Sequence, residues 1–163
     1  MSKILISGYY GFANAGDEAM LTAIIESLRQ VEKNVELTVL SGNPEDTAAK
    51  HQVCSVYRFN PLGIIRAMKD SELIISGGGS LLQDVTSKRS LLYYLSIIGL
   101  GKFFGKKVML FAQGIGPIRA KWARKLTSLV CNEADLITVR DSESAAELIE
   151  MGVKPEKITV TAG

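Results

Sequence analysis

Residues 8–18 read G-Y-Y-G-F-A-N-A-G-D-E, and the interpretation of the whole chain depends on this segment. It follows an apolar run at residues 3–7 and precedes an amphipathic run at residues 19–31, a succession that predicts a strand, a turn and a helix. Glycines at positions 8, 11 and 16 are typical of a turn whose backbone takes positive φ angles or approaches another group closely. Asp17 is the predicted N-cap of the helix, which places Glu18 in the first helical turn.

This turn does not match the common phosphate-binding loops. It contains neither G-x-G-x-x-G nor G-K-[ST], and two carboxylates at a helix N-terminus would repel a phosphate. We therefore expect a ligand rich in hydroxyl or amide groups, with Asp17 or Glu18 accepting hydrogen bonds from sugar hydroxyls or taking a proton from one. Tyr9, Tyr10 and Phe12 give the turn more ring surface than a plain connection needs. The alternative is a tight turn before a capped helix, without a ligand.

The composition is that of one globular domain whose charge points to no particular partner. The chain has 163 residues, of which 47% are hydrophobic and 22% charged, and its formal net charge is +2. This balance argues against disorder and gives no support to nucleic-acid binding. Cys54 and Cys131 are single, far apart and in apolar surroundings, so we expect reduced core cysteines of a cytosolic protein rather than a disulfide or a metal site.

We expect neither a secretory signal nor a membrane span. The chain enters a predicted strand at once, which is not the pattern of a signal peptide. Residues 91–104 are strongly apolar, but a span needs about 20 such residues, so a buried helix is the better interpretation. Peripheral contact of this helix with a membrane stays an open alternative.

Strands and helices alternate along the chain. The expected strands are residues 3–7, 35–41, 53–57, 71–76, 107–113, 136–140 and 158–161, and the expected helices are residues 19–31, 45–50, a segment opened by Asn60 and Pro61, 88–104, 120–133 and 143–151. Because the strands are mostly apolar and β-branched, we predict a doubly wound, mainly parallel, Rossmann-like α/β sheet. In the helix at 120–133 we expect Trp122, Leu126, Leu129 and Val130 to face the core.

Four unusual loops, at residues 8–18, 77–84, 113–119 and 140–142, each follow a predicted strand. In a parallel sheet such loops leave from the carboxyl edge, where ligands bind, so we expect the four to converge there. The second loop combines three consecutive glycines, which let a ligand approach closely, with Gln83 and Asp84, which add an amide and a carboxylate. A glycine-rich turn without a ligand is the alternative. In the third loop Gln113 ends an apolar strand, and we expect its side chain to point into the crevice.

The fourth loop begins with Arg140, the last residue of a predicted strand, directly before Asp141, Ser142 and a new helix. A guanidinium beside a helix N-terminus suits a phosphate or a carboxylate. The alternative is a structural ion pair of Arg140 with Asp141 or Glu143. His51 lies in a polar stretch, and we expect it to be solvated and without a role.

Taken together, four motifs resemble those of the polysaccharide pyruvyl transferase family, above all its CsaB-type members from bacterial cell-wall polymer synthesis. The motifs are G-Y-Y-G-F-A-N-A-G-D-E-A at residues 8–19, S-G-G-G-S-L-L-Q-D at 76–84, A-Q-G-I-G-P at 112–117 and I-T-V-R-D-S at 137–142. All four occur in the family's order, and the resemblance covers the whole chain. It implies one half of an enzyme similar to two-domain glycosyltransferases of the GT-B type.

The resemblance also implies an activity. Such enzymes transfer pyruvate from phosphoenolpyruvate to a sugar as a ketal, and the CsaB-type acceptor is N-acetylmannosamine in a lipid-linked precursor of a cell-wall polysaccharide. Phosphoenolpyruvate is then a co-substrate, and neither a cofactor nor a metal is expected. We expect a cytoplasmic enzyme that can work at the inner face of the membrane, with a homo-oligomer as a further expectation.

The resemblance assigns roles to residues of the four loops. Arg140 matches the arginine of the family's V-R-D motif and would hold the phosphate or carboxylate of the donor. Asp17, Glu18 and Arg140 are the candidate catalytic residues. The candidate substrate-binding residues are Gly8, Tyr9, Tyr10, Gly11, Asn14, Gly16, Gly77, Gly78, Gly79, Ser80, Gln83, Asp84, Gln113, Gly114, Gly116 and Arg140.

Length separates this chain from the family pattern of two domains. Residues 1–163 fit one domain. We expect the N-terminal, acceptor-side domain of a longer enzyme, inactive by itself, with the donor-side domain and the general acid outside this sequence. The alternatives are half of a GT-B-type nucleotide-sugar glycosyltransferase or epimerase, and a non-catalytic glycan-binding domain.

Overall fold

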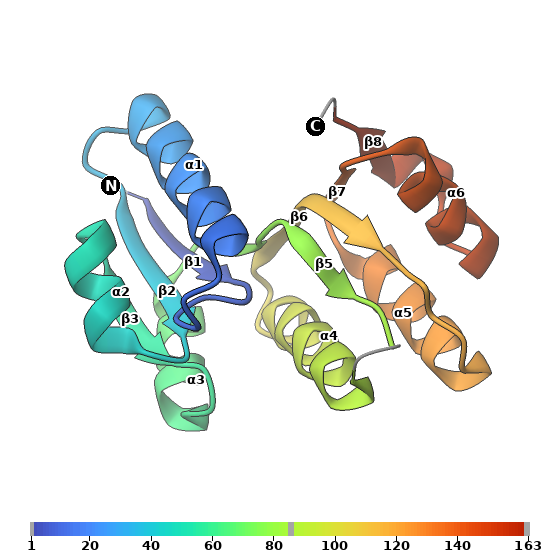
Figure 1. The fold of residues 1–163 in the computed structure, drawn as a ribbon, viewed down its shortest axis with the longest axis horizontal. Helices are drawn as coiled ribbons and strands as arrows, with labels where there is room; N and C mark the ends of the chain where they lie inside the picture. The colour runs from blue at the N-terminus through green and yellow to red at the C-terminus, as the bar shows by residue number, and fades with distance from the viewer. Residues whose placement is uncertain (1, 85–86, 162–163) are drawn as a thin grey trace.

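The computed structural model describes residues 2–84 and 87–161 and shows an α/β fold built on one sheet of eight strands (Figure 1). The strands are β1 (Lys3–Ser7), β2 (Glu36–Ser41), β3 (Cys54–Tyr57), β4 (Leu73–Ser76), β5 (Gly79–Leu82), β6 (Lys107–Ile115), β7 (Leu136–Val139) and β8 (Ile158–Val160). The helices are α1 (Ala15–Val31), α2 (Pro44–His51), α3 (Pro61–Asp70), α4 (Lys88–Phe103), α5 (Lys121–Glu133) and α6 (Ser142–Met151), with a 3-10 turn at Pro155–Lys157.

All strand pairs among the described residues are parallel, which confirms the predicted doubly wound sheet. Seven strands follow the order β3-β2-β1-β4-β6-β7-β8, and β5 pairs with β6 beside that path. The direction of winding therefore reverses between β1 and β4, the point at which open parallel sheets bind their ligands. Ser7 lies opposite Ser76 there, so the loops after β1 and β4 start side by side.

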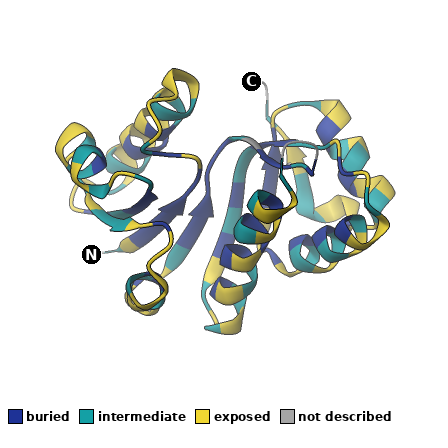
Figure 2. Cartoon of the chain, turned by 60° about the horizontal axis from the view of Figure 1, so that its bottom comes forward, coloured by how far each residue is buried: buried dark blue, intermediate teal, exposed yellow. Residues whose placement is uncertain are grey.

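Helices cover both faces of the sheet, and the strands are buried between them (Figure 2). On one face Leu5 and Ile74 belong to a core shared with α3, α4 and α5. On the other face Ile6 and Ile75 pack with α1. Neighbouring strand residues serve opposite cores because successive side chains of a strand point to opposite faces. This is why the strand sequences are apolar throughout instead of alternating.

Strand β5 departs from the prediction of a loop at residues 77–84. Gly79 pairs with Gln113 and Leu82 with Ile115, so β6 also continues beyond the predicted end at residue 113. Leu81 and Leu82 are both buried. Removing these two side chains from water brings the segment onto the sheet in spite of the glycines before it.

Helix α1 begins at Ala15, earlier than the predicted residue 19, and Asn14 takes the N-cap position predicted for Asp17. The Asn14 Oδ1 atom accepts a hydrogen bond from Asp17 N at 3.1 Å. Asparagine caps a helix as well as aspartate does. The Asp17 carboxylate is thus inside the first turn and is not used as the cap.

The buried face of α5 differs from the prediction. Ala123, Thr127 and Cys131 are fully buried, whereas Trp122 and Leu129 are 47% and 60% exposed. The buried positions recur every four residues and carry small side chains, because α5 packs between α4 and α6. The core position is confirmed only for Leu126 and Val130, which pack partly buried against that core.

The two cysteines are free, but only one is in the core. Cys131 is fully buried, and burial raises the pKa of its thiol to about 12. Cys54 is exposed on β3, so the prediction of a core position was wrong for it. The reason is that β3 is at the end of the strand order and has a neighbour on one side only.

Helix α4 contains all of the apolar stretch at residues 91–104 except Phe104, which is its C-cap. Leu91, Leu95 and Ile98 are buried in the core, as predicted for this segment. Across residues 2–84 and 87–161, no helix has both the length and the apolar character that crossing a membrane requires.

Candidate functional site

Tyr10 lies at the point where the loops after β1 and β4 begin. Its ring is fully buried against Gly8 and Gly77: a Cβ atom on Gly8 would lie 2.6 Å from the Tyr10 hydroxyl, and one on Gly77 would lie 3.1 Å from its Cζ atom. Burial raises the pKa of the hydroxyl well above its usual range, and the Asp17 carboxylate adds to the shift. The Tyr10 ring therefore packs the two loops together, and its full burial does not fit the predicted contact with a substrate.

This packing predicts a clear effect of Gly77→Ala on stability. The added methyl group would press on the Tyr10 ring and lie 3.2 Å from Ser7 O, so the free energy of unfolding should fall by about 1–3 kcal/mol. Gly99→Ala is the matched control, because a Cβ atom there meets nothing within 4 Å and the position is inside α4, where alanine should add about 0.5–1 kcal/mol. Denaturant unfolding of both variants measures the difference, and equal stabilities would contradict the tight packing.

Asp17 connects the first loop to the second. It is half-buried near the start of α1, and a Cβ atom on Gly79 would lie 2.9 Å from its Oδ1 atom. Gly79 has φ +100°, a conformation that favours glycine. Burial raises the pKa of the Asp17 carboxyl above its ordinary value, and the neighbouring charge of Glu18 raises it further. The structure thus brings the predicted residues Asp17 and Gly79 together, with a carboxylate that holds its proton more tightly than usual.

Glu18 has a structural task in this domain. Its Oε2 atom accepts a hydrogen bond from Gly11 N at 3.3 Å, and its Oε1 atom is 3.3 Å from His51 Nε2. The His51 side chain is only 9% exposed, so the prediction of a solvated histidine was wrong. Nothing in the local sequence signals this contact, because the two residues are 33 positions apart. Asp17 is therefore the freer of the two candidate catalytic carboxylates.

Aromatic surface remains on the outside of the first loop. The rings of Tyr9 and Phe12 are stacked with their centroids 4.4 Å apart, and both are exposed. Asn14 and Gly16 lie next to them at the exposed start of α1. Exposed ring faces beside polar groups are typical of ligand sites. Phe12 is not among the predicted substrate-binding residues, although the ring cluster in residues 9–12 includes it and its ring stacks on Tyr9.

Gln113 does not point into the crevice. Its side chain is fully buried and reaches from β6 to β4, where Nε2 donates to Ser76 O at 3.0 Å and to Gly77 O. The amide thereby fixes the backbone from which the glycine loop starts. The predicted direction was wrong because β6 continues past Gln113, so this residue is still within the sheet.

Asp84 is a second structural carboxylate. It accepts hydrogen bonds from Arg119 N at 2.9 Å and Ala120 N at 2.9 Å, and so ties the end of the second loop to the segment before α5. The hydrogen bond from Ala120 N is the main cause that lowers the pKa of the Asp84 carboxyl. Gln83 is half-buried beside it, and the Ser80 side chain lies outside the described part of the structure.

Asp84 should make the stability of the folded chain depend on pH in the acidic range. Its pKa is lower in the folded chain than the unfolded value of about 3.9, so its contribution is complete above that value and is lost as the pH falls through the folded pKa. We expect the melting temperature of the wild type to fall more steeply below about pH 4 than that of Asp84→Asn. Glu133→Gln, on the exposed surface of α5, is the control, and parallel curves for wild type and Asp84→Asn would contradict the assignment.

Arg140 lies over the third loop. A Cβ atom on Gly114 would be 2.6 Å from Arg140 Nε, so a side chain there would displace the guanidinium from its present position. Asp141 caps α6 by accepting a hydrogen bond from Ser144 N at 2.7 Å, and the Ser144 side chain, followed by this backbone bond, lowers the pKa of Asp141. The Arg140–Asp141 ion pair is long, at 3.6 Å, and half-exposed. The structural pair is therefore present, but it leaves guanidinium donors open to solvent.

The predicted site residues fall into two groups along the carboxyl edge. Asp17 is at the β1–β4 switch point, whereas Arg140 follows β7, three strand positions from β1 in the order of the sheet. At about 4.8 Å per strand this is about 14 Å. Gly116 is in the turn after β6, between the two groups. The fold places both groups on one edge without bringing Asp17 and Arg140 into contact.

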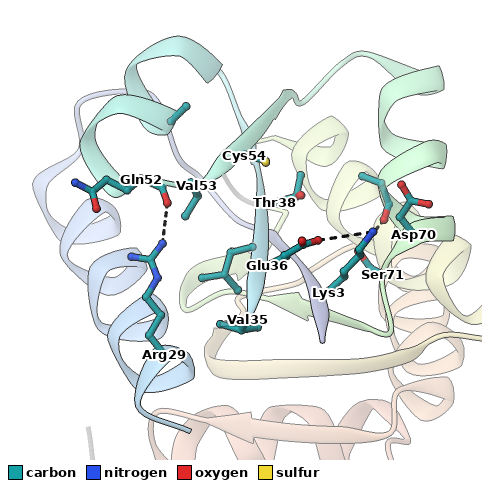
Figure 3. A pocket seen from close by; sticks show the side chains of 13 residues that line it. Lys3, Arg29, Val35, Glu36, Thr38, Gln52, Val53, Cys54, Asp70 and Ser71 are labelled. Atoms are coloured by element: carbon teal, nitrogen blue, oxygen red, sulfur yellow. Dashed lines mark hydrogen bonds and ion pairs between the residues drawn. The ribbon is translucent and has the colours of Figure 1, made fainter. Parts of the chain in front are cut away.

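A wide hollow lies at the opposite, amino edge of the sheet (Figure 3). It has a volume of about 590 Å³ and is lined by Lys3, Glu36 and Asp70 among others. Its polar groups pair with one another, as in the Lys3–Glu36 ion pair at 3.7 Å and the hydrogen bond from Arg29 to Gln52 O at 2.7 Å. None of the predicted site residues whose side chains are described lines it, so we do not place the site there. Within the described ranges, no three His, Cys, Asp or Glu side chains gather as metal ligands.

Solved structures share this fold at low sequence identity. Anabaena HepE in complex with UDP-glucose has a TM-score of 0.66 and 15% identity, covering 98% of this chain and 43% of that chain. The UDP-GlcNAc 2-epimerase from Neisseria meningitidis bound to UDP-GlcNAc has a TM-score of 0.59 and 13% identity, covering 99% of this chain and 46% of that chain. The lipopolysaccharide outer core galactosyltransferase WaaB has a TM-score of 0.58 and 16% identity, covering 97% of this chain and 44% of that chain. The likeness is thus to one half of a GT-B-type enzyme, and this chain spans less than half the length of each structure.

The sequence comparison is more specific than the fold. No protein of curated function matches the chain significantly. The family model for polysaccharide pyruvyl transferase matches residues 14–162, which include the Asp17 carboxylate, the second glycine loop and Arg140. Because this match covers nearly the whole chain, the protein belongs to the polysaccharide pyruvyl transferase family.

Proposed function

We propose that the protein transfers pyruvate from phosphoenolpyruvate to a sugar as a ketal, and that this domain holds the acceptor. Family membership supports the reaction class. The observation that carries the role of this domain is the half-buried Asp17 carboxylate between the loops after β1 and β4, at the switch point of the sheet. We further propose N-acetylmannosamine of a lipid-linked cell-wall precursor as the acceptor, in the cytoplasm, and a second domain that binds the donor.

The reaction needs a proton at carbon, two attacking hydroxyls and a place for negative charge. The methylene carbon of phosphoenolpyruvate gains a proton and becomes a methyl group, while one sugar hydroxyl oxygen bonds to the adjacent carbon and loses its proton. The bond from that carbon to the phosphate oxygen then breaks, phosphate leaves, and a second hydroxyl oxygen takes its place as it loses its proton. A general base and a cationic group for the leaving phosphate are required.

Asp17 suits the base and Arg140 suits the cationic group. A base works best when its pKa is near the working pH, and burial moves the pKa of Asp17 upward in that direction. Glu18 is the weaker candidate because both of its oxygens already hold Gly11 and His51. Arg140 has donors open to solvent beside the N-terminus of α6, where an anion is favoured. We assign the general acid to the proposed second domain.

The test uses the full-length protein with phosphoenolpyruvate and an N-acetylmannosamine-containing, lipid-linked acceptor analogue. Phosphate release and the mass of the acceptor are followed in the same reaction. Release of phosphate together with the mass gain of a pyruvate ketal supports the proposal. If folded protein consumes no phosphoenolpyruvate with any of several acceptors, the proposal fails. Binding of a nucleotide sugar would then favour a glycosyltransferase or epimerase, as the UDP-bound neighbours suggest.

A further inference from the structure

Arg58 is a buried cation without a carboxylate partner. It follows β3, is only 6% exposed, and no ion pair to it occurs among residues 2–84 and 87–161. Its Nε atom is buried and has no hydrogen-bond partner in this part of the chain. A buried charge is costly unless a counter-charge or hydrogen bonds compensate it. The position therefore calls for an anion that residues 2–84 and 87–161 do not supply.

Aromatic rings surround this guanidinium, whose Nε atom has no hydrogen-bond partner among the described residues. The Arg58 Cζ atom lies 4.6 Å from the centroid of the Tyr93 ring, 4.8 Å from Phe59 and 5.2 Å from Phe12. Rings attract the cation through their faces, whereas the N–H donors of a guanidinium point outward in its own plane. The rings thus hold Arg58 in place, and its unpartnered Nε donor is available to a planar or tetrahedral anion.

The guanidinium is at one end of an apolar pocket between α3 and α4, which lie on the same face of the sheet (Figure 1). The pocket has a volume of about 250 Å³, and Ile64, Ile65, Ile97 and Leu100 line it. Of the described residues that line it, Arg58 alone carries a charge. Exposed Leu62 and Phe103 extend the apolar surface of the same two helices. An occupant must therefore combine an anionic head with an apolar chain.

The pocket also adjoins the proposed acceptor loop. Phe12, which stacks on Tyr9 in the first loop, is one of the rings over Arg58. A molecule could thus place a sugar at the first loop, its phosphate at Arg58 and its chain between α3 and α4. We propose that this pocket binds the lipid end of the acceptor, a phosphate or diphosphate joined to a linear isoprenoid chain. The proposal rests on the proposed function, because it names the acceptor's carrier.

Farnesyl diphosphate is the probe, titrated into the full-length protein by calorimetry without phosphoenolpyruvate or sugar. Inorganic diphosphate and farnesol test the head and the chain separately. We expect farnesyl diphosphate to bind at least about tenfold more tightly than either, since only it fills both ends of the site. Equal binding of inorganic diphosphate would mean a plain anion site, and equal binding of farnesol a plain apolar site. Either result overturns the proposal.

Two variants locate the binding. Arg58→Gln should weaken the binding of farnesyl diphosphate at least about tenfold. Ser96→Phe should weaken it as much, because it places a ring in the pocket from an exposed position of α4 and leaves Arg58 unchanged. Ser27→Phe on the exposed surface of α1 is the matched control and should bind like the wild type. If Ser96→Phe binds normally, the pocket assignment is wrong even where Arg58→Gln fails to fold.

The test separates this proposal from the transferase proposal. Binding is measured without turnover, so it can be present when no ketal forms and absent when ketal formation is normal. Phosphatidylglycerol vesicles without an isoprenoid phosphate give the remaining comparison. If the protein binds these vesicles but not farnesyl diphosphate, and Ser96→Phe abolishes that binding, the pocket faces a bilayer surface and the lipid-phosphate proposal is overturned.

Discussion

In the full-length protein, Asp17→Asn is expected to lower kcat for ketal formation by about 10²–10⁴-fold, the range that general acid–base catalysis contributes. Asparagine keeps the shape of the side chain beside Gly79 and removes its ability to accept a proton. The wild-type rate should rise with pH through the pKa of Asp17, which burial places above the ordinary value of about 3.9. That acidic limb of the pH–rate profile should be lost in the variant.

Asp17→Asn should not lower the stability of the protein, although it lowers kcat. Because the folded pKa is raised, protonated Asp17 favours the folded state, and this contribution is lost as the pH rises through the folded pKa. At neutral pH the neutral asparagine should therefore be as stable as the wild type or more so. Asp46→Asn is the matched control, because Asp46 occupies the same position in α2 after the N-cap Asn43. Unchanged kcat, KM and pH profile in Asp17→Asn would remove its assigned role.

Arg140→Ala should lower kcat/KM for phosphoenolpyruvate by about 10²–10³-fold, the usual cost of removing one donor from developing negative charge. Folding should be nearly unaffected, because the side chain is half-exposed and its ion pair with Asp141 is long and solvated. Arg140→Lys should recover part of the loss, since it keeps the charge and lacks the planar fork. Steady-state kinetics with varied phosphoenolpyruvate, together with a melting curve, measure both effects.

Arg119→Ala is the control for Arg140→Ala. Arg119 is exposed on the segment before α5, at the same edge of the sheet, and its contacts with Asp84 are made by its backbone nitrogen. The variant therefore removes one positive charge without removing that hydrogen bond. If both variants lose activity equally, general charge at this edge is responsible. If Arg140→Ala is folded and fully active, Arg140 serves only as the partner of Asp141.

Much of the fold could be predicted because the strands are buried on both faces. Runs such as L-I-I-S at β4 are mostly apolar and include β-branched isoleucines, so local composition is sufficient to identify them. Strand β5 shows where this fails. The glycines at residues 77–79 indicate a loop, and only the burial of Leu81 and Leu82 against distant residues brings the segment onto the sheet. A local pattern carries no information about that burial.

The convergence of the loops was predictable from the topology, but the direction of each side chain was not. Parallel strands require the four loops to share one edge. Whether Tyr10 faces a ligand or the core depends on the space that Gly8 and Gly77 leave for it. Arg58 was missed altogether, because its signal is weak: a cation between two aromatic residues directly after a strand. Its surroundings become visible only when Tyr93 of α4 is placed beside it.

The packing of Tyr10 against Gly8 and Gly77 also has an evolutionary consequence. A larger residue at position 77 fits only after the ring at position 10 has become smaller, and a smaller residue at position 10 leaves a void until position 8 or 77 fills it. The effects of changes at these contacting positions are therefore not additive. Most single substitutions at these positions give a less stable protein. Selection therefore acts on the three residues together.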